Sequence, residues 1–469
     1  MSRSHLLLAS LLVSGCVDFK PEPLELSATA MALESRTLSE AGLRTFIEEN
    51  RKQPIRVWPI AVWDFETLCL ASLYFHPDLE IARAQWRSSV AAEKTASARS
   101  NPTVSLTPEY AVNPESSMSP WLAAINFDVP VETAGKRTIR MQRARLLSDA
   151  ARLHVVATSW QIRKQLREAL FERELAQRRV NLLEKRVVLQ DETLSLYEER
   201  KRVGESAESE ILPFRIAHQT ATIDLGTSIH AAADALSRVA AAIGLPVSAL
   251  EGVAIRVEID PAPVSPDEAR RKRRFALENR SDIRETLSLY EASQTTLQLE
   301  VAKQYPDVHL GSGYQYDQGE NKWAIGVGIE LPVFNRNEGP IAEAYAKRQE
   351  AAARVRAAQA AAINEVDSAL LAANAAVVQV TNAQRMSDAS RKNVRSLEEQ
   401  AARGAEDRLQ VLVARSDQIA GELIVLETRI TAARARAGLD DAVQVSDDEI
   451  VEARQEAAPT ASAATREVR

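Results

Sequence analysis

The chain has 469 residues, in which 58 Lys and Arg stand against 65 Asp and Glu for a net charge of −7. Hydrophobic residues make up 45% and charged residues 26%, which is typical of a folded chain, and glycine is scarce. The mild acidity, without a dense basic stripe, argues against a nucleic-acid partner. The length allows two or three domains or one elongated assembly.

Residues 1–15 are interpreted as a secretory signal peptide. Arg3 supplies the positive start, an apolar run covers 6–13, and two small residues follow. The string Leu12-Val13-Ser14-Gly15-Cys16 resembles a bacterial lipobox, so we expect Cys16 to be lipidated. An ordinary signal peptide with an incidental cysteine is the alternative. No later apolar run reaches the about 20 residues of a membrane helix, so a membrane crossing is expected to use strands.

The remaining elements are predicted in chain order. Residues 16–60 are a lipid-anchored N-terminal segment, with 17–60 peripheral or disordered, and the first helical stretch covers 64–100. Strands are expected at about 103–112 and 121–131, followed by helices over 136–203 and 206–243. After a linker at 251–264, the second half predicts a helix over 265–303, strands at about 307–317 and 322–333, and helices over 339–403 and 406–438. A disordered tail covers 441–469.

The two halves follow one plan, which predicts an internal two-fold repeat with units at 61–250 and 265–440. Asn101-Pro102 is echoed by Tyr305-Pro306, and Val203-Gly204 by Arg403-Gly404, in the same order. Apolar residues in the last helix step by three and four, as in a coiled coil. This seam consists of Ile419, Leu423, Leu426 and Ile430, continued by Ala433 and Ala437.

The predicted strands alternate apolar residues with polar or tiny ones over about ten positions, as in a lipid-facing barrel wall with a wet lumen. Aromatic residues near the turns fit a membrane interface. Four strands cannot close a barrel, because about eight is the smallest workable number. Open edges are not tolerated in lipid, so the barrel must be shared among chains. A buried sandwich is the alternative, but it needs a partner sheet that the chain does not supply.

These features resemble the outer membrane factor family, the TolC-like proteins. The resemblance rests on the two-fold repeat, on Asn101-Pro102 and on the two glycine turns. It also rests on two runs, Glu132-Thr133-Ala134-Gly135-Lys136-Arg137 and Leu331-Pro332-Val333-Phe334-Asn335-Arg336-Asn337-Glu338-Gly339. The run at 132–137 is most similar to the branch that serves heavy-metal pumps. The resemblance implies a mainly α fold with a small β part: a homotrimer in which helical hairpins form a periplasmic α-barrel and twelve strands form a transmembrane β-barrel.

The resemblance also implies a function and its sites. The duct would sit in the outer membrane lipid, lipid-anchored, and carry cargo from an inner-membrane RND pump through a periplasmic adaptor protein. Val203, Gly204, Arg403 and Gly404 would contact the adaptor. Relatives carry aspartates near the second turn, where this chain has Gln410 and Val413, so the pore-entrance acids are expected elsewhere: Glu205, Glu208, Glu210, Glu406 and Asp407. Barrel-lumen acids are Glu109, Asp128 and Glu330.

No catalytic, cofactor-binding or metal-binding pattern is found in the sequence, so an enzyme is not expected. The first hypothesis for the function is efflux of heavy-metal cations. The alternative is a channel for multidrug efflux or type I secretion. A periplasmic adaptor or scaffold lipoprotein is an alternative of another class. The doubled plan counts against an adaptor, which usually has one helical hairpin.

Overall fold

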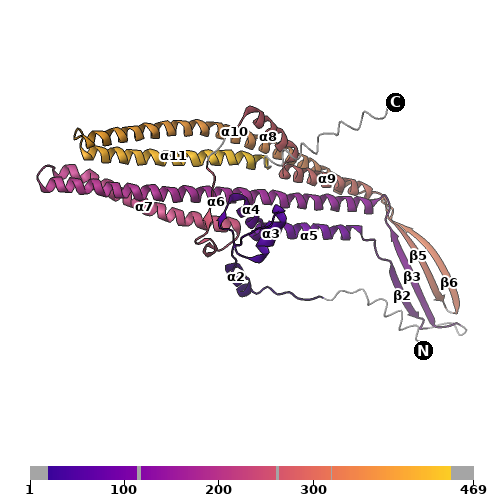
Figure 1. Ribbon diagram of the computed structural model, residues 1–469. Coiled ribbons are helices and arrows are strands. Elements are labelled where there is room, and N and C mark those ends of the chain that lie inside the picture. The colour runs from indigo at the N-terminus through magenta and orange to yellow at the C-terminus, as the bar shows by residue number, and fades with distance from the viewer. Residues whose placement is uncertain (1–18, 113–117, 260–262, 318, 445–469) are drawn as a thin grey trace, which may run out of the picture.

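The computed structural model describes residues 19–112, 118–259, 263–317 and 319–444. Long helices lie side by side in a rod, and a small sheet extends from one end of it (Figure 1). Cys16 and the predicted signal peptide lie outside the described residues, as do residues 445–469 of the predicted tail.

Short helices gather near the middle of the rod. They are α2 (Leu26–Glu34) and α3 (Ala41–Arg51), followed by β1 (Val62–Trp63), α4 (Phe65–Phe75) and α5 (Pro77–Ser97). Leu43 and Ile47 of α3 are fully buried in the core that also holds Trp63, Leu68 and Ile243. The expectation that residues 17–60 are peripheral or disordered is therefore wrong for α3, whose two apolar side chains complete this core.

The predicted helix over 64–100 is broken at one point. His76 has an extended backbone, and its Nδ1 accepts a hydrogen bond from the Asp78 N–H. Pro77 follows as the first residue of α5, where its missing N–H costs nothing. The break separates α4, which belongs to the compact middle, from α5, which runs toward the sheet.

The two halves of the chain contain the same order of elements. The first has β2 (Thr103–Tyr110), β3 (Trp121–Val131), α6 (Lys136–Arg202) and α7 (Glu208–Ile243). After η1 (Val247–Leu250) and β4 (Ala254–Ile255), the second half has α8 (Pro266–Asn279), α9 (Ser281–Ala302), β5 (Val308–Asp317), β6 (Glu320–Ile329), α10 (Glu338–Ala402) and α11 (Arg408–Val443). The 67 residues of α6 reach about 100 Å, which explains the rod.

The long helices form a layer. In Figure 1 the half away from the sheet runs in the order α7, α6, α11 and α10, and the contacts between α6 and α7, α6 and α11, and α10 and α11 agree. Toward the sheet, α5 and α9 take the places of α7 and α11 beside the long helices. The long helix α6 therefore packs along four shorter helices, α5 and α7 on one side and α9 and α11 on the other, whereas α10 packs mainly along α9 and α11.

An arginine marks each point where one shorter helix gives way to the next. Arg36 donates to the carbonyl oxygens of Phe75, at 3.1 Å, and Gly244, at 3.4 Å. Arg280 donates to the Ala442 carbonyl at 2.6 Å. The last carbonyls of a helix have no partner within it, so these guanidinium groups stabilise the helix ends.

The four-stranded sheet has the order β2-β3-β5-β6, with every neighbouring pair antiparallel. The first strand is shorter than predicted and ends at Tyr110. The last strand ends at Ile329, so the expected extension to residue 333 is wrong: Leu331 and Val333 lie in an exposed connection to α10. Both edge strands, β2 and β6, are unpaired within the described chain.

The helix α10 contradicts the expectation that no apolar run after the signal peptide reaches the length of a membrane helix. Within α10, an 18-residue window reaches a mean hydropathy of 1.2, and 22% of that window is buried. By length and composition alone this helix is apolar enough to cross a membrane, but such a score is also reached by helices of soluble proteins. The sequence of this region is rich in alanine and valine, so it forms no long run of large apolar residues.

Candidate functional site

The register of the sheet sorts its side chains onto two faces. Paired residues of antiparallel strands project to the same side, and successive residues alternate. One face carries Val104 opposite Phe127 and Leu106 opposite Ile125, continued by Tyr314 and Trp323. This face is open to solvent in the single chain, with Trp323 81% and Ile325 92% exposed. The apolar face therefore needs a covering that the described chain does not provide.

Aromatic pairs stand at the far end of this apolar face. Tyr110 and Trp121 have ring centroids 5.0 Å apart, and Tyr314 and Trp323 have centroids 4.9 Å apart. Such amphipathic rings suit the boundary between an apolar and an aqueous phase.

The opposite face is polar or nearly bare. Thr103 stands opposite Asp128, and Ser105 opposite Asn126, while β5 and β6 contribute Gly311, Gly313, Gly326 and Gly328. Asp128 Oδ2 lies 2.9 Å from His309 Nδ1 on this face. Glu109 lies on it too, opposite Leu122. Glu330 was expected among these acids, but it lies one residue beyond the end of β6, so its place on this face is not supported.

The first hairpin joins the helices through a joint around Lys136. The basic residues that begin at Lys136 were expected on a solvated helix face with partners on neighbouring helices, which is wrong for Lys136 because its side chain is buried. Lys136 opens α6, is only 8% exposed, and donates to Asp307 Oδ1 at 2.8 Å and the Tyr305 carbonyl at 2.5 Å. Asp307 also accepts from the Thr133 N–H at 2.9 Å. Burial acts to raise the pKa of Asp307, but these hydrogen bonds outweigh it and lower the pKa below the usual value.

Arginines complete this joint. Arg140 pairs with Glu132, and Arg137 donates to the Ser97 carbonyl at the end of α5. Gly135 precedes Lys136 with φ of 68°, a conformation that glycine adopts without penalty. The run 132–137 thus leads the chain from the sheet into α6. The hydrogen bonds of Thr133 and Lys136 attach this turn to Asp307 in the second half of the chain. The signal that could have revealed it is the density of charges around one glycine.

The second hairpin meets α10 through a lighter joint. Asn337 takes the place of Gly135, with φ of 62°, and its Nδ2 donates to the Glu300 carbonyl at 2.7 Å. Asn tolerates this left-handed conformation better than most side chains. No buried lysine corresponds to Lys136 in the described part of this joint, where Glu338 is exposed.

The two predicted tip turns lie at the opposite end of the rod from the sheet (Figure 1). Gly204 has φ of 83° and Gly404 has φ of 73°. In each turn the next residue donates back across the helix end: Glu205 to the Arg200 carbonyl at 2.8 Å, and Ala405 to the Gln400 carbonyl at 3.0 Å. Both are Schellman turns, which favour glycine at this position. Val203, Arg403 and the two glycines are exposed, as a contact surface requires.

The predicted entrance acids gather near the tips, and most of them are engaged. Asp407 directly precedes α11 and caps it: it accepts a hydrogen bond from the Leu409 N–H and two from Arg200, at 2.7 and 2.8 Å. The Arg200 hydrogen bonds hold the pKa of Asp407 below its usual value. Glu208 pairs with Lys201 and Arg215.

The remaining acids act locally. Glu210 accepts from the Ala207 N–H at 3.2 Å, and Glu406 accepts from the Asp407 N–H at 3.2 Å. Glu205 is exposed at the first tip. In the single chain, four of the predicted acids therefore cap helices or pair with arginine and lysine, which accounts for their position without a pore.

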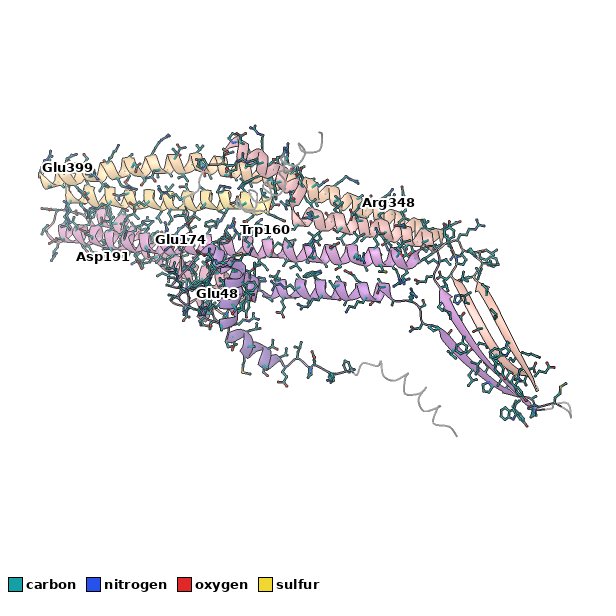
Figure 2. The ribbon with its side chains drawn as sticks, turned by 45° about the vertical axis from the view of Figure 1, so that its right-hand side comes forward. Glu48, Trp160, Glu174, Asp191, Arg348 and Glu399 are labelled. Atoms are coloured by element: carbon teal, nitrogen blue, oxygen red, sulfur yellow. The ribbon has the colours of Figure 1, made fainter. Side chains whose placement is uncertain are left out.

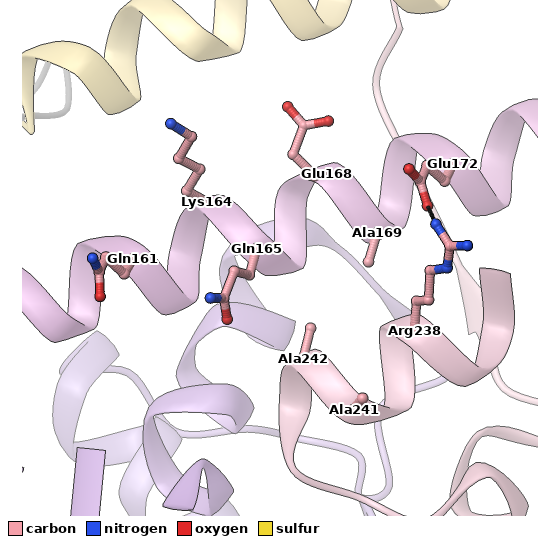
Figure 3. A pocket seen from close by; sticks show the side chains of 9 residues that line it. All are labelled: Gln161, Lys164, Gln165, Glu168, Ala169, Glu172, Arg238, Ala241 and Ala242. Atoms are coloured by element: carbon pink, nitrogen blue, oxygen red, sulfur yellow. Dashed lines mark hydrogen bonds and ion pairs between the residues drawn. The ribbon is translucent and has the colours of Figure 1, made fainter. Parts of the chain in front are cut away.

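An open groove of about 710 Å³ lies near the middle of the rod, between α6 and α7. Figure 3 shows Gln161 and Gln165 on one side of α6, Lys164 and Glu168 on another, and the ion pair that joins Glu172 of α6 to Arg238 of α7. Leu166 and Leu170 lie on another side of the same helix, within the core. The groove offers paired charges and amides but no nucleophile with a base. Among the described residues, no group of three His, Cys, Asp or Glu side chains is placed to hold a metal.

Comparisons with known proteins agree with this arrangement. A family model described as outer membrane efflux protein matches residues 274–443. The chain is 25% identical to the cobalt-zinc-cadmium resistance protein CzcC of Cupriavidus metallidurans over 230 residues, 48% of this chain. The matched region is 53% of CzcC, so the chain spans about half the length of this curated relative.

Solved structures show the same fold. The outer membrane protein VceC from Vibrio cholerae matches with a TM-score of 0.68 at 20% identity, covering 81% of this chain and 96% of VceC. CusC matches with a TM-score of 0.66 at 18% identity, covering 81% of this chain and 91% of CusC. The family match over residues 274–443 and the likeness to CzcC agree with the two-faced sheet on a rod of paired helices: the second half of the chain is similar to outer membrane efflux proteins, and the whole chain has the fold of VceC and CusC.

Proposed function

We propose that this protein is the outer-membrane exit duct of a tripartite RND-type efflux system and exports heavy-metal cations. The main support for a duct is the four-stranded sheet. One face of the sheet is apolar and exposed, and the opposite face is polar. In a transmembrane barrel, an apolar face contacts lipid and a polar face lines a water-filled lumen. Its relatives are channel proteins, so the duct conducts cargo and performs no chemistry on it.

The duct is a homotrimer in this proposal. Each chain supplies four strands with two unpaired edges, and lipid does not tolerate open edges. Three copies give about twelve strands, above the smallest barrel. The same order of elements in residues 61–250 and 265–440 supports a two-fold internal repeat, so three chains present six similar helical hairpins to the periplasm.

The sheet end sits in the outer membrane and the rod extends into the periplasm. Lipidation of Cys16 fits this placement. Replacing Cys16 with Ser should therefore abolish acyl labelling and weaken retention in the outer membrane.

The tips meet the periplasmic adaptor. Val203-Gly204 and Arg403-Gly404 are the exposed ends of matching Schellman turns, remote from the sheet. Cysteines at Ser206 and Ala405 should crosslink to the adaptor, whereas cysteines on the sheet should not. Entrance acids at Glu205 and Glu208 remain part of this proposal, as do Glu109 and Asp128 in the lumen, which would favour cations.

Deletion of the gene tests which cargo the duct exports. The likeness to CzcC, named for resistance to cobalt, zinc and cadmium, supports sensitivity to these divalent metals. Growth of the deletion strain on metal salts is compared with growth on dyes, detergents and antibiotics, with the intact gene resupplied as the control. Sensitivity only to the organic compounds would reassign the cargo to multidrug efflux and leave the duct intact.

A further inference from the structure

A histidine and an aspartate form a pair on the polar face of the sheet. His309 Nδ1 lies 2.9 Å from Asp128 Oδ2, between the neighbouring strands β5 and β3. Both side chains remain accessible in the chain, with His309 49% and Asp128 42% exposed. The pair is therefore open to a ligand in the aqueous space that this face borders.

The positions around this pair are bare. Gly328 stands opposite His309 on β6, and Gly311 stands opposite Asp128 on β5. A Cβ added at Gly328 would lie 3.5 Å from the His309 Cβ, so a larger side chain there would lie against the imidazole. In Figure 1 and Figure 2 the sheet extends away from the rod, and no helix in the described part of the chain covers its polar face. Glycine weakens a strand but often marks a place where a ligand approaches closely.

The carboxylate of Asp128 selects one form of the imidazole. An ionised carboxylate only accepts hydrogen bonds, so His309 Nδ1 carries the proton and donates it. In the neutral ring, Nε2 then keeps its lone pair. Histidines that bind metals in proteins are oriented in the same way, because their second ring nitrogen usually donates to a carboxylate or a carbonyl. His309 is thus oriented as a metal ligand through Nε2.

We propose that His309, oriented by Asp128, is a weak binding site for borderline divalent cations such as Zn²⁺ and Co²⁺. Imidazole suits these ions, whereas Mg²⁺ and Ca²⁺ prefer oxygen ligands. The inference rests on the proposed function and adds a place where the wall of the lumen binds the cargo. The ion bonds to Nε2 of His309, and Asp128 is a positioning residue that keeps its hydrogen bond to Nδ1.

The composition of the site predicts that it holds an ion loosely. Within the described chain, no third His, Cys, Asp or Glu joins the pair to make a chelating group, so water fills the remaining coordination positions. Asp307, two residues before His309, is bound by Lys136 at 2.8 Å, which offsets its charge.

The proposed assembly keeps the sites of different copies apart. Neighbouring strands are about 4.8 Å apart, so a barrel of about twelve strands measures at least about 58 Å around its wall. Three imidazole groups spread around such a wall are too distant to share one ion. Loose binding at separate sites suits passage, because conduction requires that an ion enters a site and also leaves it.

Protection of His309 from carbethoxylation tests this site. The purified oligomer in detergent is treated with diethylpyrocarbonate at increasing Zn²⁺ or Co²⁺, and mass spectrometry follows the modification of each histidine. We expect the rate at His309 to fall about tenfold when the metal stands about ten times above its dissociation constant, and to be unchanged by Mg²⁺. His230, exposed on α7 and paired with no carboxylate among the described residues, is the internal reference. Equal protection of His230, or no protection of His309, would overturn the proposal.

A matched pair of substitutions tests the role of Asp128. Asp128→Asn removes the carboxylate that orients the imidazole, so the Co²⁺ concentration that gives half-protection of His309 should rise about tenfold or more. Glu320→Gln removes one carboxylate from the far end of β6 and should leave that concentration unchanged. Equal shifts in the two variants would show a general attraction of cations to the acidic sheet and would refute a site at His309.

The protection experiment is independent of the deletion strain that tests the cargo. A metal-sensitive deletion strain together with an unprotected His309 would refute this site and leave the proposed function standing. A protected His309 together with a deletion strain sensitive only to organic compounds would support the site and reassign the cargo.

Discussion

The helices α6 and α10 have nearly the same length, 67 and 65 residues, and the same place in the two halves, but their surroundings differ. The interior of α6 holds Ile162, Leu166, Leu170 and Leu183, which are among the largest fully buried side chains. Over the described part of α10, the buried residues are alanine, valine and serine. A helix at the edge of a layer needs small residues toward its one neighbour and keeps larger ones, such as Leu371, exposed.

Helices with similar sequence patterns therefore acquire different roles from their position in the layer. Both long helices begin with a left-handed residue and end in the same glycine turn. Between these ends, α6 is covered on both sides and α10 on one. The two helices should therefore differ at their starts and behave alike at their tips.

The largest difference is expected at the start of the helices. Lys136→Met removes two hydrogen bonds from a buried ammonium group and leaves Asp307 and the Tyr305 carbonyl without it. We expect the free energy of unfolding to fall by about 2–3 kcal/mol. Glu338→Gln at the exposed start of α10 should change it by less than about 0.5 kcal/mol. Tryptophan fluorescence during urea unfolding in detergent measures both, and equal losses would contradict the contrast between the joints.

At the tips the two helices should behave alike. Gly204→Ala and Gly404→Ala each force a side chain into a left-handed conformation, at a cost of about 1–2 kcal/mol. Amide hydrogen exchange at the two turns should accelerate to a similar extent. Gly438→Ala within α11, where a Cβ meets nothing within 4 Å, is the control and should not accelerate it. A large effect at only one tip would show that the turns are not equivalent.

The sequence predicted the architecture because its signals are periodic. The seam at Ile419, Leu423, Leu426 and Ile430, the alternation in the strands and the glycine turns each fix local geometry. Helix ends were accordingly right within a few residues, as at 136–203 against Lys136–Arg202. The break at His76 was missed, although Pro77 stood in the sequence, because the apolar pattern continues on both sides of it.

The candidate site was predicted less completely. The sequence placed Asp128 on the polar face but also Glu330, because alternation alone does not show where a strand ends. It treated Asp407 as a free acid, whereas Arg200, 207 residues away, binds it. Such pairing depends on which helices meet, and periodicity carries no information about long-range partners. The buried Lys136 was missed for the same reason.

A smaller effect is expected where α11 ends beside α6. Asp441 is buried, and burial raises its pKa to about 6 despite the nearby Arg167. Arg167 Nη1 lies 3.2 Å from Oδ1 but hydrogen-bonds to the Ala437 carbonyl, so this oxygen accepts no hydrogen bond. The corresponding position of α7 is Ala241, which lines the open groove.

The pH dependence of Asp441 follows from this raised pKa. The folded chain holds the proton more tightly than the unfolded one, so stability falls as pH rises from the unfolded value toward 6. Asp441→Asn removes this cost. Its stabilising effect should be about 1 kcal/mol larger at pH 7.5 than at pH 5. Thermal unfolding of both proteins at the two pH values measures it, and a difference independent of pH would show that Asp441 titrates normally.

The smallest effect is expected at the end of α6. The Arg200 side chain binds Asp407 of α11, whereas the side chain of the corresponding Gln400 of α10 donates a hydrogen bond to Ser396 of its own helix. Exposed ion pairs contribute little and are screened by salt, so Arg200→Ala should slightly accelerate hydrogen exchange in the first turn of α11 at low salt. Gln400→Ala should not. Because Arg200 lowers the pKa of Asp407, its contribution is present above the usual aspartate pKa and is lost as pH falls through the lowered value. An effect of Arg200→Ala that persists in high salt would show that packing, and not charge, joins the two helices there.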